Sequence, residues 1–77
     1  MLDNESVRLI IAEAVKGFEI SELDNSQDFA EAGIDSLDHS LILLAIEEKT
    51  GVKIPDEAIE TCSSVVGIVA YLKDHKP

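Results

Sequence analysis

The chain has 77 residues, of which 16 are acidic and six are basic, so its formal net charge at pH 7 is −10. A polypeptide of this length buries only about 60–65% of the surface that its unfolded form exposes, which leaves one modest core and no second lobe. The acid excess argues against nucleic acid and anionic membrane as partners, because both are polyanions. We therefore expect one domain over residues 1–77 with basic partners.

Hydropathy and cysteine usage indicate the compartment. The longest uninterrupted apolar run, Leu41 to Ile46, is six residues long, against the roughly 20 that a membrane span needs. The first five residues carry acid where a secretory signal or mitochondrial presequence would carry base. The single cysteine, Cys62, excludes an internal disulfide and fits a reducing compartment. We expect a cytoplasmic monomer that does not insert into membranes.

The acidic residues are concentrated in the middle of the chain. Between Glu19 and Glu60 there are twelve Asp or Glu and two Lys, and the remaining residues carry four acids and four bases. The excess therefore lies on one part of the molecule. This distribution indicates either a face with a binding role or a contribution to solubility alone.

The first predicted element is a helix. Its apolar residues recur at i, i+3, i+4, i+7, i+8 and i+11, the spacing of one helix face: Val7, Ile10, Ile11, Ala14, Val15 and Phe18. Asp3 or Asn4 can cap its start, and Gly17 can end it. The following stretch, from Gly17 to Asp35, has no regular apolar spacing. We expect it to be a long loop that lies on the core.

A second helix is predicted from Asp35 or Ser36 to about Lys49, before Gly51. At about 100° per residue its apolar side chains form two nearly opposite stripes. One stripe holds Leu37, Leu41, Leu44 and Ala45, and the other holds Ile42, Leu43 and Ile46. Such a helix is either central to the fold or keeps one stripe for a partner.

The last third of the chain predicts two further helices. A short one follows Pro55, from Asp56 to about Thr61. A final one is capped by Ser63 or Ser64 and turns five apolar residues inward: Val65, Val66, Ile68, Val69 and Leu72. The predicted fold is therefore all-α, with three longer helices, one short helix and a long first loop.

The sequence lacks the residue patterns of a catalyst. It has no Cys/His pair at metal-ligand spacing, no glycine-rich phosphate loop and no Ser/His/Asp set with a plausible base. His39 and His75 are interpreted as surface or helix-end residues, and Cys62 as small core filler. We expect neither enzymatic activity nor a metal site.

One segment has a chemical interpretation: Gly33-Ile34-Asp35-Ser36-Leu37-Asp38, where a loop enters a helix. A serine at a helix N-terminus places its hydroxyl beside unpaired backbone N–H groups. A phosphate attached there would meet the positive end of the helix dipole. The alternative is that Asp35 or Ser36 merely caps the helix.

This segment is followed at fixed intervals by Glu47-Glu48, Gly51 and Ile54-Pro55-Asp56-Glu57. The series resembles acyl carrier proteins, especially the discrete ones of bacterial fatty-acid synthesis, over essentially the whole chain. The resemblance implies a four-helix bundle, residues 1–77 as a single acyl-carrier domain, and 4′-phosphopantetheine from coenzyme A attached to Ser36 through a phosphodiester. The thiol of that arm would carry the acyl group as a thioester.

The resemblance also implies the partners. They are a phosphopantetheinyl transferase and enzymes that transfer or modify acyl groups, which would bring basic patches to the second helix. The residues assigned to docking are Asp35, Leu37, Asp38, Leu41, Leu44, Glu47 and Glu48. Their charges would mainly raise the encounter rate and set orientation.

Four positions depart from the family pattern. Leu41 stands where an acid is frequent, Thr50 where an aromatic residue is, Ala32 where leucine is, and Cys62 where a larger aliphatic residue is. These departures favour a specialised member, and they leave the pathway open among fatty-acid, lipid and related secondary biosynthesis.

Three other functions remain open from the sequence. An aminoacyl or peptidyl carrier would use the same Ser36, and an adaptor would leave it unmodified. A small calcium-binding protein would use Asp24, Ser26, Asp28 and Asp35, at loop positions 1, 3, 5 and 12 of an EF-hand. That count places Phe29 where the motif needs glycine, and it ends on an aspartate rather than a glutamate.

Overall fold

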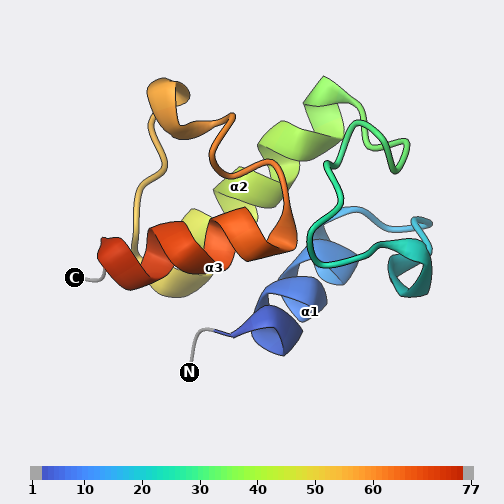
Figure 1. Ribbon diagram of the computed structural model, residues 1–77, viewed down its shortest axis with the longest axis horizontal. Helices are drawn as coiled ribbons and strands as arrows, with labels where there is room; N and C mark the ends of the chain where they lie inside the picture. The colour runs from blue at the N-terminus through green and yellow to red at the C-terminus, as the bar shows by residue number, and fades with distance from the viewer. Residues whose placement is uncertain (1–2, 76–77) are drawn as a thin grey trace.

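A computed structural model describes residues 3–75. Within this range the chain forms three α-helices and two single-turn 3₁₀ helices, and it has no strand: α1 (Asn4–Ala14), η1 (Ile20–Glu22), α2 (Ser36–Thr50), η2 (Asp56–Ala58) and α3 (Val65–Asp74). Figure 1 shows the connection between α1 and α2 lying at one end of the molecule, beside the start of α2. The all-helical prediction is confirmed. None of these helices is long and apolar enough to cross a bilayer.

Helix α1 begins at the predicted cap and ends earlier than expected. The Asp3 carboxylate accepts a hydrogen bond from the backbone N–H of Ser6 at 2.9 Å, and this bond holds the pKa of Asp3 below its usual value. The helix ends at Ala14, with Val15 as its C-cap. Gly17 follows in the left-handed conformation, with φ of 91°, and turns the chain away.

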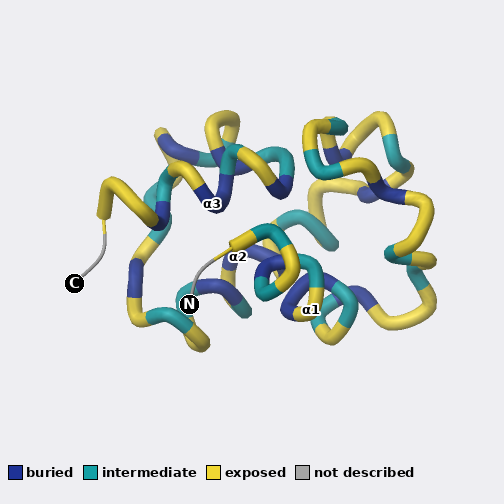
Figure 2. Tube along the Cα trace, turned by 60° about the horizontal axis from the view of Figure 1, so that its bottom comes forward, coloured by how far each residue is buried: buried dark blue, intermediate teal, exposed yellow. Residues whose placement is uncertain are grey.

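The core lies between the three α-helices. Its fully buried aliphatic side chains come from each of them and include Val7, Ile11, Ile42, Ile46, Ile68 and Leu72. Figure 2 shows these buried segments facing the interior while exposed residues lie on the outer sides of the helices. Because each fully buried aliphatic side chain contributes about 1.5–3 kcal/mol, this apolar interior is the main stabilising feature of so small a domain.

Residues 15–35 connect α1 to α2 and rest on this core. Leu23, Phe29 and Ile34 are each no more than 3% exposed. The connection is therefore held by its own apolar side chains, although η1 is the only helical turn within it. Such packing explains how a long irregular segment stays ordered in a compact domain.

Arg8 of α1 adds a polar attachment to the same connection. Its guanidinium donates to the carbonyl oxygens of Ile20 and Leu23, and to Oδ1 of Asn25 at 3.0 Å. The Ile20 carbonyl oxygen also accepts from the backbone N–H of Leu23, and Arg8 adds a second donor to it. The several N–H donors of the Arg8 guanidinium thus hold the connection to α1.

The short helix predicted over residues 56–61 is not confirmed. The structure has one 3₁₀ turn, η2, followed by irregular turns up to Ser64. Within these turns the Ser63 hydroxyl donates to the carbonyl oxygen of Glu60 at 2.7 Å. Serine and threonine side chains compete for backbone groups in this way, which disfavours a continuing helix.

Helix α3 is capped by Ser64, whose hydroxyl accepts a hydrogen bond from the backbone N–H of Gly67 at 3.0 Å, as predicted. Four of its five predicted inward residues are buried. Val66 is 45% exposed, so that prediction is wrong. At about 100° per residue, Val66 lies off the face formed by positions i, i+3, i+4 and i+7 from Val65.

Candidate functional site

Ser36 is the first residue of α2, and its side chain is exposed. The Asp35 carboxylate caps the helix by accepting a hydrogen bond from the backbone N–H of Asp38 at 2.8 Å. Within residues 3–75, the Ser36 hydroxyl makes no hydrogen bond. Of the two residues that the sequence offered as caps, Asp35 has that role, and Ser36 presents a free hydroxyl.

The preceding loop fixes the position of this serine. Phe29 and Ile34 are buried, and the backbone N–H of Ile34 donates to the carbonyl oxygen of Phe29 at 2.9 Å. Gly33 lies between them with φ of 90°, a conformation that L side chains rarely adopt. A Cβ added to Gly33 would have no atom within 4 Å, so the space beside it is open to solvent. The loop is thus anchored on both sides of a turn that leaves Ser36 accessible.

His39 also supports the start of α2, a role that the sequence analysis did not predict. It was predicted to be a surface or helix-end residue, but its ring is half-buried, and its Nε2 lies 3.0 Å from the carbonyl oxygen of Cys62, to which it donates. The ring also meets Phe29 edge to face, with centroids 5.2 Å apart. Its position three residues before Ile42 and seven before Ile46 places it on the inward stripe, which was the signal available in the sequence.

The residues assigned to docking differ in how far they protrude. Leu37 is 70% exposed, Leu44 51% and Leu41 42%. Asp35 and Glu48 are also exposed, whereas Asp38 and Glu47 are half-buried. Ile42, Leu43 and Ile46 on the other stripe are buried. The prediction of two opposed stripes is therefore confirmed for the leucines and isoleucines, whereas Ala45, predicted on the outward stripe, packs partly buried against the core.

The acidic residues of the loop are engaged in turns. The Asp28 carboxylate accepts a hydrogen bond from the backbone N–H of Ala30 at 2.8 Å, and Asp35 caps α2. Across residues 3–75, no group of three or more His, Cys, Asp or Glu is arranged to hold a metal ion. The calcium-binding alternative finds no support in this geometry.

Three of the unusual positions are buried or half-buried. Cys62 is fully buried, and burial raises the pKa of its thiol to about 11. Thr50 is half-buried and closes the end of α2, since its hydroxyl donates to the carbonyl oxygen of Ile46 and accepts from the backbone N–H of Val52. Ala32 packs partly buried against the core. All three are smaller or more polar than the residues that the resemblance leads us to expect at these positions.

The surroundings of Ser36 fit a group attached through a phosphodiester. The hydroxyl is exposed and free, and the space beside Gly33 is open. The first backbone N–H groups of an α-helix have no partner within the helix and favour an anion. An arm attached here would extend into solvent without displacing a core side chain.

Comparison with known proteins identifies the family. Residues 5–72 match the family described as phosphopantetheine attachment site. The acyl carrier protein of Helicobacter pylori is 35% identical over 72 residues, which cover 94% of this chain and 92% of that protein. The acyl carrier protein of Zymomonas mobilis subsp. mobilis is 32% identical over the same shares. The chain therefore belongs to the acyl carrier protein family, whose prosthetic group is phosphopantetheine.

Proposed function

We propose that Ser36 carries 4′-phosphopantetheine and that the protein delivers acyl groups, as thioesters on this arm, between enzymes of fatty-acid, lipid or related secondary biosynthesis. Acyl carrier proteins are carriers rather than catalysts. The assignment of Ser36 is supported by its free, exposed hydroxyl at the start of α2. Asp35, and not Ser36, caps this helix.

Attachment requires one bond to form and one to break. The Ser36 Oγ bonds to the phosphorus that bears the pantetheine portion of coenzyme A, and the bond from this phosphorus to the nucleotide phosphate breaks. The nucleotide leaves as adenosine 3′,5′-bisphosphate, and the serine proton passes to a base on the transferase. When bound, the arm supplies a thiol that accepts the acyl group as a thioester. Asp35 keeps the helix start ordered while Ser36 remains accessible.

The acidic outward side of α2 is the proposed docking face. It consists of Asp35, Leu37, Asp38, Leu41, Leu44, Glu47 and Glu48. Its exposed leucines would form the apolar centre of a small interface, and its carboxylates would steer basic partners toward Ser36. The transferase and the acyl-handling enzymes would share this face, so each contact would have to be weak and short-lived.

We also propose that residues 1–77 act as one carrier domain in the cytoplasm. In the four-helix bundle expected of the family, η2 and the turns after it would occupy the place of the short helix. In support, Ala58 is buried and Ile59 packs partly against the core. The buried, free Cys62 is consistent with a reducing compartment.

The assignment of Ser36 is tested by intact mass. Incubation with coenzyme A and a broad-specificity phosphopantetheinyl transferase is expected to add one arm to the wild type and none to Ser36→Ala. Ser40→Ala is the matched control, because Ser40 is exposed one helical turn further along. An arm found on another residue by peptide mapping, or no arm on the wild type, would overturn the assignment.

The cargo is tested separately. The intact mass of the protein isolated from its native cells reports the arm and its acyl group together. A fatty or modified acyl group supports the proposed pathway class, whereas an amino acid or peptide on the arm would establish the alternative carrier class.

A further inference from the structure

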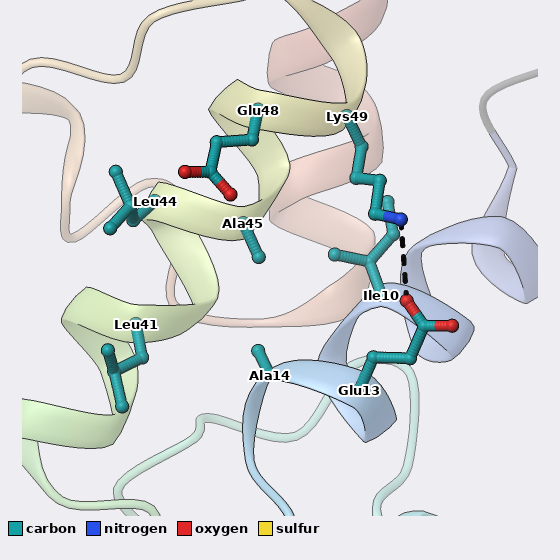
Figure 3. Close-up of a pocket in the computed structure, with 8 residues that line it drawn as sticks. All are labelled: Ile10, Glu13, Ala14, Leu41, Leu44, Ala45, Glu48 and Lys49. Carbon is teal, nitrogen blue, oxygen red and sulfur yellow. Dashed lines mark ion pairs between the residues drawn. The ribbon is translucent and has the colours of Figure 1, made fainter.

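A groove runs along the surface between α1 and α2, on one side of the docking face (Figure 3). Leu41 and Leu44 of α2 stand at its outer edge, and Ala14 of α1 and Ala45 of α2 point toward each other across its floor. Ile10 continues the apolar lining on α1. The two small alanine side chains leave the space that larger residues would fill.

Charged groups lie at one end of this groove. Lys49 of α2 reaches across to Glu13 of α1, with 3.6 Å between Nζ and Oε1. This is the one ion pair within residues 3–75. Glu48, which also lines the groove, is exposed and has no cation paired with it in that range. The groove therefore combines an apolar floor with a free carboxylate, a combination that suits an apolar group next to a positive charge.

The dimensions suit a helix. Leu41, Ala45 and Lys49 follow one another at intervals of four residues and form a ridge about 12 Å long at 1.5 Å per residue. Ile10 and Ala14 form a second ridge on α1 with the same spacing. A helix laid between two such ridges would place side chains from about two of its turns into the groove.

We propose that this groove binds an amphipathic, basic helix of a partner protein, which inserts a large apolar side chain between Ala14 and Ala45 and places a Lys or Arg beside Glu48. A second copy of this chain is a poor occupant, because two molecules of charge −10 repel each other. The proposal extends the docking surface from α2 onto α1. Leu41 would then favour partner helices that carry a large apolar side chain. It rests on the proposed carrier function only in expecting the partner to be an acyl-handling enzyme.

The probe is a synthetic amphipathic helix of about four turns, with Leu and Phe on one face and flanking Lys and Arg. A charge-matched peptide with Ser at the apolar positions is the comparison. Titration into the unmodified protein, followed by backbone amide NMR shifts, is expected to perturb residues of both groove walls, including Ala14 and Ala45, and to give a weaker Kd for the Ser peptide.

Two matched pairs of variants test the site. Ala14→Met fills the floor, and Ala70→Met makes the same change at an exposed position on α3. Leu41→Ser removes an apolar edge, and Leu9→Ser does so at a leucine that is 67% exposed but does not line the groove. Each groove variant is expected to weaken Kd about tenfold, because Ala14→Met fills the space that the partner's side chain needs and Leu41→Ser removes an apolar contact. Each control is expected to leave Kd within about twofold.

Each of three results would overturn the proposal. The first is an equal weakening of Kd by the groove and control variants, which would mean that the acidic surface attracts the peptide without a specific groove contact. The second is a set of shifts confined to the residues around Ser36. The third is self-association of the protein alone that Ala14→Met abolishes, which would make the groove an interface between copies. Because the peptide assay uses unmodified protein, its failure is distinct from a failure of Ser36 to be loaded.

Discussion

The two sides of α2 differ in exposure although both are aliphatic. Ile42 and Ile46 are fully buried, whereas their neighbours Leu41 and Leu44 are 42% and 51% exposed. Residue type does not separate the two rows, since leucine and isoleucine have similar apolar area. Angular position on the helix does, because one row faces the core while the other faces solvent. The inward row stabilises the fold, and the outward row is available for binding.

The largest effect is expected from placing the same charge on each row. Ile46→Glu would bury a carboxylate without a partner and should lower the free energy of unfolding by several kcal/mol. Leu41→Glu should change it by less than about 1 kcal/mol, as surface substitutions usually do. Urea titration of both variants measures the difference. A severe loss of stability in Leu41→Glu would show that the connection folds over that side of α2 in solution.

Cys62, which lies in the same core as the inward row of α2, should make stability depend on pH. Burial raises the pKa of the Cys62 thiol from 9.0 to about 11, so between these values the unfolded chain loses the proton before the folded protein does. The unfolded state then binds fewer protons, and stability falls as pH rises through this window. Thermal melts at increasing pH should show a fall that is steeper in the wild type than in Cys62→Ala. Parallel pH profiles for the two proteins would contradict a buried thiol.

A smaller contrast is expected between two neighbours at the start of α2. Asp35→Ala removes the helix cap and should lower the free energy of unfolding by about 1 kcal/mol. Ser36→Ala should leave stability within about 0.5 kcal/mol, because the Ser36 hydroxyl is exposed and bonds to no described group. Denaturant melts of the two variants make the comparison. The reverse order would mean that Ser36 is the functional cap.

The smallest effect concerns the charges beside the outward row. Glu48→Lys should slow loading of Ser36 by the transferase at low ionic strength, and the difference should shrink at physiological salt, where exposed charges are screened beyond about 8 Å. Glu22→Lys, at an exposed position in η1, is the control for net charge. Equal loading rates for Glu48→Lys and the wild type at low salt would show that Glu48 does not steer the transferase toward Ser36.

Much of this fold could be predicted from local pattern. Residue types at helix ends narrow each cap to two adjacent candidates, of which Asp3 and Ser64 have the role, and they predict the end of α2 before Gly51, which adopts the left-handed conformation. The two stripes of α2 follow from spacing alone. These features depend on neighbours within one or two turns, so the sequence carries them directly.

Other features depend on contacts between distant segments. The half-buried position of His39 is set by Phe29 and Cys62, which lie 10 and 23 residues away from it. The turns after η2 are held to the connection between α1 and α2, because the carbonyl oxygen of Ser63 accepts a hydrogen bond from the backbone N–H of the distant Phe29. At the candidate site, the serine could be recognised from its motif, but the use of Asp35 as the cap and the groove shared with α1 required the assembled helices.

The long connection between α1 and α2 is tied to both terminal helices. Arg8 holds its first part to α1, and the backbone N–H groups of Phe29 and Val66 donate to the carbonyl oxygens of Ser63 and Asn25, which joins it to the start of α3. Segments joined in this way are expected to open together as one cooperative unit. We expect hydrogen exchange of the Phe29 and Val66 amides to report the same opening free energy. Fraying at Thr50, the other end of α2, would break none of these bonds, so Ser36 would keep its place.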